Sequence, residues 1–362
     1  MKKKALILGV GNMGLAISHA MYELGFRLEC VDVSKQQLGK LRHIIPSTLE
    51  YDCFQSSPLT FEKDLGDLVG NKPDIVISSL PYHQTEKVAR SCIDNGVRYA
   101  DLGGRVDVSE RINESALPNK NLVATDLGLA PGWVNIISEF ICDELEGHEI
   151  KNVTMMVGGL PEEPDPRNPF KYNVTWSVDG LINEYRDDCV ILEDGNPKVV
   201  AGMDGLETTD TQLGTLECFY TSGGASHSIK SMSERGIKGC SYKTLRYKGH
   251  CDLVRFLIRD CFLPDSCLKQ LFQVGCSGGG KDVVILKVSV ESEKDRKQNI
   301  TNREVVVNAD DKFSAMQKAT AFPISAVASL MANGEFDHLD SFSYKDVPKD
   351  KFEDSLSHLG IL

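Results

Sequence analysis

The sequence predicts an α/β protein: a Rossmann domain with a doubly wound parallel sheet, followed by an α+β domain built on a largely antiparallel sheet. Apolar strand patterns alternate with helical periodicity over roughly the first 130 residues. From residue 149 onward, strand patterns follow one another with few helices between them. The 362 residues exceed one ordinary core. We therefore expect residues 1–130, completed by about 312–362, to form the first domain and residues 131–311 the second.

The first thirty-odd residues predict a dinucleotide site. An apolar strand over residues 3–9 runs into G-x-G-x-x-G, a helical pattern follows to Leu24, and a second strand over 28–33 carries Asp32. A glycine turn lets the backbone approach a pyrophosphate at the positive end of the helix. Asp32 can accept hydrogen bonds from a ribose diol and would repel a 2′-phosphate, so we predict NAD in preference to NADP. A glycine-rich turn in an unrelated α/β protein is the alternative.

Further strands are expected at residues 74–80, 98–102 and 121–127. Ligands of parallel sheets bind beyond the carboxyl ends of the strands. The predicted cofactor residues lie in the glycine turn and at these strand ends: Gly9, Gly11, Asn12, Met13, Gly14, Asp32, Ser79, Leu80, Pro81 and Gly103.

Three titratable residues at the same strand ends are candidates for catalysis. Asp101 and Asp126 could hold an amino group or take its proton, or could instead cap the turns that follow them. His83 titrates near neutrality, which suits a base for an ammonium, although it could equally be a turn residue or a neighbour of the cofactor. The identity of the base stays open.

In the second domain, strands are expected over residues 153–157, 171–177, 215–221, 243–247, 283–290 and 304–308, with a hairpin over 190–200 that turns at Asp194-Gly195. Residues 312–333 read as helical, with an interruption at Pro323. The polar tail after Gly334 is expected to return to the first domain. Because strands outnumber the helices that could cover them, we expect a sheet-based homodimer.

Composition restricts the classes of function. With 41% hydrophobic and 25% charged residues the chain reads as soluble and globular, and its net charge of −12 argues against nucleic acid or an anionic membrane as partner. The basic start, Met1 to Lys4, resembles a signal peptide, but the apolar stretch behind it breaks at Gly9, so a cytoplasmic location is expected. The eleven cysteines include no C-x-x-C pair; we expect mostly buried thiols and no metal site.

Five sequence motifs in the chain are more specific than the general pattern of an α/β protein. They are GLAPGWVN (128–135), VGGLP (157–161), NPFKYNVTWSVDGLINEY (168–185), YTSGG (220–224) and YKTLRYKGH (242–250). In this order they resemble the saccharopine dehydrogenase family, in particular the saccharopine reductase and lysine 6-dehydrogenase group. The resemblance covers nearly the whole chain. It implies a Rossmann domain, a discontinuous second domain that binds substrate and dimerises, and nicotinamide-dependent chemistry at a carbon–nitrogen bond.

Two departures from the family pattern bear on the activity. Saccharopine reductases typically read GLDPG and CGGLP where this chain has GLAPG and VGGLP, so Ala130 and Val157 replace an acid and a thiol. Together with Asp-Leu-Gly-Gly at 101–104 and YTSGG, this looks more like lysine 6-dehydrogenases. The prediction is therefore NAD-dependent oxidation of the ε-amine of L-lysine to 2-aminoadipate 6-semialdehyde, with release of ammonia. Alternatives are a saccharopine dehydrogenase or reductase, a carboxyspermidine-type oxidoreductase, or a non-catalytic NAD-binding regulator.

Three residues of the second domain are expected to bind substrate. Arg246 lies in an alternating strand, and its planar guanidinium suits the α-carboxylate of an amino acid; the alternative is a surface arginine paired with an acid. The resemblance also places Lys171 and Tyr172 at the substrate face, against a solvated lysine and a packed aromatic ring as alternatives.

Overall fold

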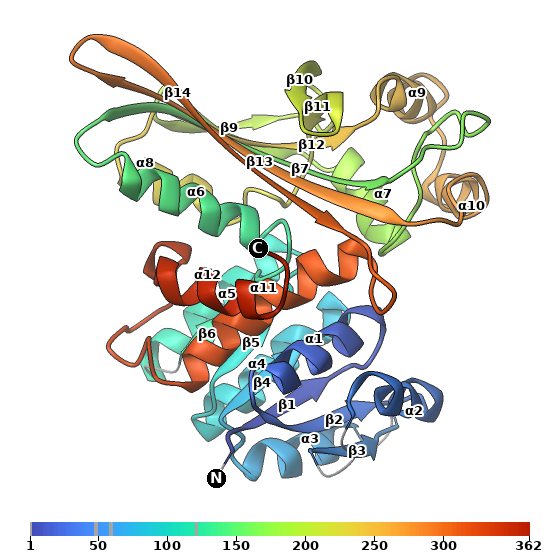
Figure 1. Cartoon of the computed structure of the whole chain (residues 1–362), viewed down its shortest axis with the longest axis vertical. Helices are drawn as coiled ribbons and strands as arrows, with labels where there is room; N and C mark the ends of the chain where they lie inside the picture. Colours follow the sequence, from blue (N-terminus) through green and yellow to red (C-terminus); the bar gives the residue numbers. More distant parts are fainter. Residues whose placement is uncertain (1, 47–49, 58–60, 120–121) are drawn as a thin grey trace. The chain divides into compact units, whose positions relative to one another are not determined.

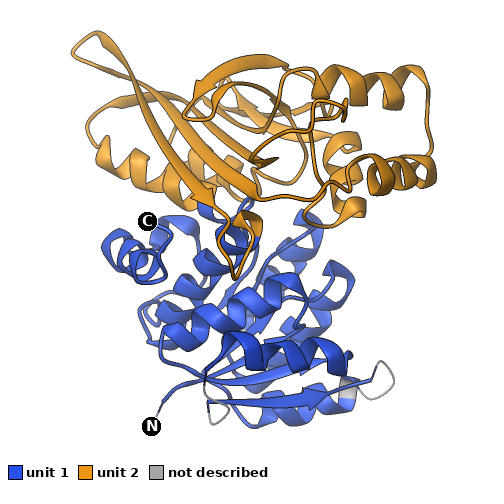
Figure 2. Ribbon diagram, turned by 45° about the vertical axis from the view of Figure 1, so that its right-hand side comes forward, with its two compact units in different colours: residues 1–133, 317–362 blue, residues 134–316 orange. Residues whose placement is uncertain are grey.

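The computed structural model describes residues 2–46, 50–57, 61–119 and 122–362. The chain forms two compact units: unit 1 comprises Met1–Trp133 and Gln317–Leu362, and unit 2 comprises Val134–Met316 (Figure 2). The predicted fold class is confirmed: unit 1 has a parallel Rossmann-like sheet, and unit 2 has a mixed, largely antiparallel one.

The sheet of unit 1 has six strands in the order β3-β2-β1-β4-β5-β6, all parallel. This is the order of a Rossmann fold, in which the strand order reverses beside β1. The strands are β1 (Lys4–Leu8), β2 (Arg27–Asp32), β3 (Tyr51–Gln55), β4 (Ile75–Ser78), β5 (Tyr99–Asp101) and β6 (Val123–Ala124). Where a strand was expected over 121–127, the observed strand β6 is two residues long. Residue 121, the first of the expected range, lies outside the described residues.

The helices that pack on the sheet of unit 1 present an apolar stripe to it. Leu6, Leu8 and Val76 of the sheet form one core with apolar residues of α3, α4 and α5, whereas Ile17 and Met21 of α1 are buried outside that core. The helices are α1 (Asn12–Glu23), α2 (Lys35–Ile44), α3 (Phe61–Gly70), α4 (Tyr82–Asn95), α5 (Val106–Ala116), α11 (Ala315–Ala332) and α12 (Lys349–His358) (Figure 1).

The end of the chain, Gln317–Leu362, belongs to unit 1. The imidazole of His358 in α12 lies 3.1 Å from the carbonyl oxygen of Glu23 in α1. The expected interruption at Pro323 was wrong, because α11 continues through it. Phe322 and Ile324 beside the proline are buried, and their packing outweighs the hydrogen bond that proline removes.

The main path of the unit 2 sheet runs β10-β11-β12-β7-β13-β14, and β8 joins β12 to β9. Only the β12–β7 pairing in this sheet is parallel. Figure 1 shows β13 and β14 as one long hairpin. The strands are β7 (Glu149–Pro161), β8 (Cys189–Glu193), β9 (Asn196–Val200), β10 (Glu207–Thr211), β11 (Gly214–Tyr220), β12 (Gly239–Arg246), β13 (Asp282–Lys294) and β14 (Lys297–Asn308).

Unit 2 also holds more helices than expected. They are α6 (Trp133–Glu144), α7 (Val178–Arg186), α8 (Ser228–Glu234), α9 (His250–Arg255), a π-helix (Phe256–Asp260) and α10 (Asp265–Gly275). Hydrophobic periodicity does not reveal the shorter helices α8 and α9, because six or seven residues make barely two turns. Asn135 of α6 donates to Ser228 of α8 at 2.8 Å and ties these two helices together.

Of two details predicted for unit 2, one is confirmed and one was wrong. The hairpin at Asp194-Gly195 is confirmed, with φ of 50° and 79° at these residues. The strand expected over 171–177 was wrong, because this segment is irregular. Asn168 explains it: its side chain accepts from the N–H of Phe170 and donates to the carbonyl of Tyr172, which replaces a strand ladder with a local turn.

All eleven cysteines are free and eight of them are buried, which confirms the expected use of cysteine as a small apolar side chain. Within the described ranges, no helix combines the length and apolar character that a membrane span requires.

Candidate functional site

The glycine loop of unit 1 has the form that a dinucleotide requires. Gly9 has a φ of +87°, and a Cβ on Gly14 would lie 1.8 Å from the carbonyl oxygen of Gly9, so both positions are restricted to glycine. Gly11 has no atom within 4 Å of the place where a Cβ would stand. A side chain there would fill open space at the start of α1, the place where a pyrophosphate meets helix N–H groups. The loop fits a nicotinamide dinucleotide.

Asp32 links this loop to the end of β2. One carboxylate oxygen accepts from the N–H of Val10 at 2.6 Å, and the other accepts from the N–H of Ser34 at 2.7 Å. The side chain is half-buried. Each carboxylate oxygen has a second lone pair, so both can still accept a ribose hydroxyl.

The other predicted cofactor residues lie at neighbouring strand ends. Ser79 follows β4, and its N–H donates to Leu8 of β1, so the turn after β4 lies beside the glycine loop. Pro81 is the N-cap of α4. Gly103 follows β5 with a φ of +78°, and a Cβ on it would lie 2.1 Å from a carboxylate oxygen of Asp126. Asn12 and Met13 begin α1.

Asp101 and Asp126 lie together, as the strand-end argument predicts. One oxygen of Asp101 accepts from the N–H groups of Gly103 and Asp126, and the other accepts from the hydroxyl of Tyr99 at 2.9 Å. Asp126 accepts from Ser109 at 2.7 Å. Burial and the neighbouring Asp126 raise the pKa of Asp101 to about 7. Both side chains are only 1% exposed, so this pair secures the turn after β5.

His83 is more accessible. It lies in the first turn of α4 and is exposed, and its ring contacts Tyr82 edge-on, with 5.9 Å between ring centroids. Tyr82 in turn packs against Gly104, so His83 belongs to the same end of unit 1 as Gly103. Of the three predicted catalytic residues, only His83 is open to solvent.

Arg246 ends β12 of unit 2 and is 3% exposed. Its Nε–H donates to the hydroxyl of Tyr185 at 3.1 Å, one Nη–H donates to the carbonyl of Leu245, and the guanidinium carbon lies 4.4 Å from the ring centroid of Tyr172. Burial alone would lower the pKa of Arg246, but Tyr185, Tyr172 and Glu184 raise it, so the guanidinium stays charged. Among the described residues, Nη2 has no hydrogen-bond partner.

The sequence did not identify His250 and Tyr185 as partners of Arg246. His250 Nδ1 lies 2.9 Å from the carbonyl of Phe170, to which it donates, so Nε2 accepts from the Tyr185 hydroxyl at 3.0 Å. Burial and Arg246 lower the pKa of His250 to about 3, so the ring is neutral. This chain of hydrogen bonds, from the Phe170 carbonyl through His250 and Tyr185, fixes Arg246 from one side. Residue spacing could not reveal it, because Phe170 and His250 lie 80 positions apart.

The two other predicted substrate residues differ in position. Tyr172 is buried at 1% exposure against Arg246 and His250. The Lys171 side chain is partly exposed, and its Nζ donates to the carbonyl of Lys248. We call Arg246, Tyr172, Tyr185 and His250 the arginine cluster.

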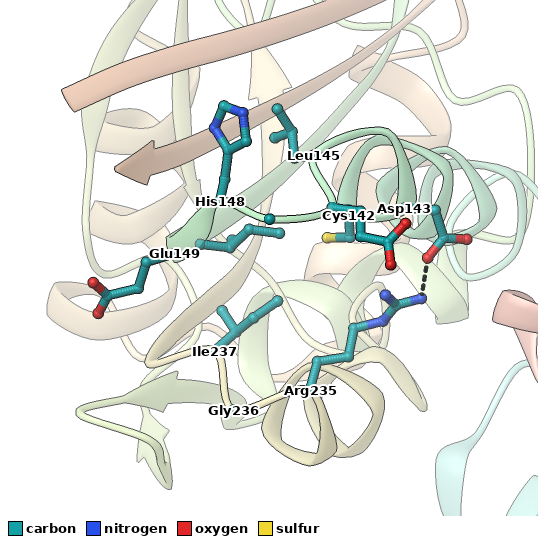
Figure 3. A pocket seen from close by; sticks show the side chains of 11 residues that line it. Cys142, Asp143, Leu145, His148, Glu149, Arg235, Gly236 and Ile237 are labelled. Carbon is teal, nitrogen blue, oxygen red and sulfur yellow. Dashed lines mark ion pairs between the residues drawn. The ribbon is translucent and has the colours of Figure 1, made fainter. Parts of the chain in front are cut away.

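A separate hollow in unit 2, of about 610 Å³, lies between α6, the start of β7 and the end of α8 (Figure 3). Arg235 projects into it but is neutralised by Asp143 and by the buried Glu139, at 2.8 Å each. No residue of the arginine cluster lines it.

A parallel sheet in the Rossmann order, a glycine loop at its switch point and a second unit with a buried arginine together define a two-domain oxidoreductase architecture. Comparison with protein families agrees. The model of the saccharopine dehydrogenase NADP binding domain matches residues 5–124, and that of the saccharopine dehydrogenase C-terminal domain matches residues 128–352. The chain belongs to the saccharopine dehydrogenase family, a family of oxidoreductases that act on carbon–nitrogen bonds. The resemblance seen in the sequence is thereby confirmed.

The curated relatives are distant and longer than this chain. A saccharopine dehydrogenase [NADP(+), L-glutamate-forming] of Schizosaccharomyces pombe is 23% identical over 66% of this chain and 55% of its own length. The mitochondrial alpha-aminoadipic semialdehyde synthase of Bos taurus is 27% identical over 58% of this chain and 22% of its own. The chain thus spans about half the length of the first and about a fifth of the second.

Among solved structures, an apo saccharopine dehydrogenase (L-Glu forming) of Saccharomyces cerevisiae matches with a TM-score of 0.74. The match covers 98% of this chain and 96% of the yeast chain, at 16% sequence identity. At that identity the likeness concerns the fold.

Proposed function

We propose that this protein oxidises the carbon–nitrogen bond at the end of a lysyl side chain, with saccharopine as the amine. The observation that carries the proposal is the match of two saccharopine dehydrogenase domain models to residues 5–124 and 128–352. The buried, charged Arg246 supports it, because an amino-acid substrate brings a carboxylate that needs a counter-charge.

The proposed reaction balances without a further reagent. A base takes the proton of the substrate's ammonium, and hydride leaves carbon 6 of the lysyl chain for the nicotinamide. Water adds to the resulting iminium, the carbon–nitrogen bond breaks, and the amine leaves with a proton. Saccharopine, NAD(P)⁺ and water thus yield 2-aminoadipate 6-semialdehyde, glutamate, NAD(P)H and one proton. Orientation of the two carbons is the protein's main contribution.

Each unit would supply one part of this reaction. The glycine loop of unit 1 and the adjoining strand ends would hold the dinucleotide. In unit 2, Arg246 would hold the α-carboxylate of the lysyl group, with its direction set by Tyr185 and its face shielded by Tyr172. For the base we propose His83, because its ring is exposed whereas Asp101 and Asp126 are buried and hydrogen-bonded.

Lysine 6-dehydrogenase activity is the second candidate, and it differs only in the leaving amine, which is ammonia instead of glutamate. The charge of the arginine cluster favours it. Saccharopine carries two further carboxylates, yet among the described residues Arg246 is the one cation of this cluster. Of the lysines near it in the chain, Lys243 pairs with Glu207, Lys171 donates to the backbone carbonyl of Lys248, and the Lys248 side chain is exposed to solvent. Ala130 and Val157 also cannot replace the acid and thiol of the saccharopine reductase pattern.

For the cofactor we propose NAD. The Asp32 carboxylate at the end of β2 supports this choice, because it would repel a 2′-phosphate there. Two comparisons favour NADP instead: the matching domain model is that of an NADP binding domain, and the fission-yeast relative is named for NADP(+). Both dinucleotides therefore have to be tested.

The experiment is a spectrophotometric assay with saccharopine and with L-lysine, each with NAD⁺ and with NADP⁺. The proposal expects NAD(P)H together with glutamate from saccharopine. NADH and ammonia from lysine alone would establish the second candidate. Dinucleotide binding without turnover of either amine would contradict both and leave a non-catalytic regulator.

We also propose that the protein is a homodimer joined through unit 2. The long β13–β14 hairpin supports this proposal. Strand β14 lies at the edge of the sheet, where its unpaired backbone groups can pair with another chain, and its apolar residue Ile300 is 66% exposed. Light scattering at micromolar concentration should give twice the chain mass of 39.9 kDa, and a monomer would remove the proposal.

A further inference from the structure

A second charged side chain stands beside the arginine cluster without a partner. Glu184 precedes Tyr185 on α7, and its backbone carbonyl accepts from the N–H of Ser222 in the YTSGG segment at 3.0 Å. This side chain is partly exposed. Within the part of the chain that the structure describes, its carboxylate accepts no hydrogen bond and forms no ion pair.

The surroundings of Glu184 identify the space that it faces. Tyr185 follows Glu184 on α7, and the hydrogen bond from Ser222 brings Glu184 to the YTSGG segment, against which Tyr242 packs. The charge of Glu184 also raises the pKa values of Arg246 and of the tyrosines at 172, 185 and 242. Burial raises the pKa of Glu184 to about 7, against the lowering influence of Arg246. Arg246 and Glu184 thus carry opposite charges in the same part of unit 2, and among the described residues no ion pair joins them.

The YTSGG segment, which ends at Gly224, maintains this arrangement. A Cβ on Gly224 would lie 2.3 Å from the ring of Tyr242, so glycine lets that ring pack against the backbone of the segment. Thr221 and Thr244 are joined by a 2.7 Å hydrogen bond between their hydroxyl groups. The sequence motifs GLINEY (180–185), YTSGG (220–224) and YKTLRYKGH (242–250) therefore lie close together in unit 2.

We propose that Glu184 binds the α-ammonium group of the substrate whose α-carboxylate is held by Arg246, so that the two side chains together recognise an L-α-amino acid head group. An ammonium is the complement of a partly buried carboxylate that has no partner of its own. The inference rests on the proposed function, and it holds for both candidate activities, because saccharopine and lysine share the same lysyl head group. It makes unit 2 selective for α-amino acids over simple amines and simple acids.

The test is calorimetric binding to the full chain, saturated with the oxidised dinucleotide, so that it does not depend on turnover. The probes are L-lysine, saccharopine and 6-aminohexanoate, which keeps the carboxylate and the terminal amine but lacks the α-ammonium. Glu184→Gln should weaken binding of L-lysine and saccharopine at least tenfold and leave 6-aminohexanoate unchanged. Glu184→Asp, which keeps the charge on a shorter chain, should restore part of the loss. Asp188→Asn, at an exposed carboxylate just after α7, is the matched control and should change nothing.

The pH provides a second readout. The titratable groups on which Glu184 acts are Arg246 and Tyr242 on β12, Tyr172 in the loop before α7, Tyr185 on α7 and Cys189 at the start of β8. The pKa values of all five are raised above ordinary values that already lie at 9 or higher. The pKa of His250, which contacts Tyr185, is about 3, so Glu184 is the member that titrates near neutrality. Wild-type affinity for L-lysine should rise as the pH passes through 7, and Glu184→Gln should abolish this rise.

The outcomes separate this inference from the function on which it rests. If Glu184→Gln weakens all three ligands in parallel, or none of them, the role of Glu184 is wrong. If Arg246→Ala leaves every affinity unchanged, or if the wild type binds neither saccharopine nor lysine, the proposed function itself fails. A loss that is confined to the two α-amino acids supports both.

Discussion

The glycine loop of unit 1 and the arginine cluster of unit 2 are built in opposite ways. The loop is made of backbone, and Asp32 joins it from 22 positions away. The cluster is made of side chains whose hydrogen bonds bridge 61 and 80 positions. In the loop, the absence of side chains creates the site, whereas in the cluster Tyr185 and His250 orient Arg246 through hydrogen bonds. Substitutions should therefore act on the loop through steric clashes and on the cluster through charge and hydrogen bonding.

The largest effect is expected at Gly14. Gly14→Ala would bring a methyl group to within 1.8 Å of a backbone oxygen that cannot move aside cheaply. We expect a loss of about 3 kcal/mol in the free energy of unfolding, together with loss of dinucleotide binding. Urea unfolding and a dinucleotide titration measure both. Gly39→Ala in α2 is the control: it meets no atom within 4 Å, so it should be neutral or slightly stabilising. Equal effects at both positions would contradict the steric account.

The next effect is an acid sensitivity of unit 2 that originates at His250. The pKa of His250 is about 3 in the folded protein and ordinarily 6.5. At a pH between these two values, the unfolded chain therefore binds a proton at His250 that the folded chain does not bind. The stability due to neutral His250 is fully present above pH 6.5 and decreases as the pH falls. From this group alone we expect about 2 kcal/mol of loss between pH 8 and pH 5.

Chemical unfolding at several pH values, compared between the wild type and His250→Gln, isolates this contribution from that of other groups. The wild type should lose more stability than the variant over this interval. Identical pH profiles would show that His250 is not held neutral in this chain of hydrogen bonds with Tyr185.

The smallest effect concerns the cofactor. Asp32→Ser combined with Val33→Arg should shift the ratio of NAD to NADP affinities toward NADP by about tenfold, or about 1.4 kcal/mol, because a carboxylate that repels the 2′-phosphate is replaced by a cation. Val33 is 57% exposed, so arginine can be accommodated there. Titration with both dinucleotides measures the ratio. Tighter binding of NADP by the wild type would refute the assignment of Asp32.

The contrast between the two regions also explains what the sequence could predict. Gly9, Gly14 and Asp32 could be located because their spacing follows from backbone geometry within one strand–helix–strand unit. The parallel sheet followed from alternating patterns for the same reason. Arg246 and Tyr172 were reached only through family resemblance, since nothing local distinguishes a buried arginine from an exposed one.

Other features escaped prediction for identifiable physical reasons. Tyr185, His250 and Glu184 acquire their roles only when α7, α9 and β12 pack together. The segment 171–177 alternates like a strand, but Asn168 satisfies its backbone groups locally. Pro323 lies within α11 because packing on both sides of it outweighs a local helix preference. In each case tertiary contacts overrode the local pattern.

We propose that unit 1 holds the dinucleotide while Arg246 of unit 2 holds the substrate's carboxylate. The most direct measurement compares NAD⁺ and substrate affinities in the wild type, Arg246→Ala and Arg246→Lys. NAD⁺ affinity should stay nearly unchanged, and substrate affinity should weaken by about 2–4 kcal/mol in Arg246→Ala. Arg246→Lys should recover only part of this loss, because a point charge cannot reproduce the planar fork. If both affinities instead fall in parallel together with the melting temperature, Arg246 is a structural residue and the claim is wrong.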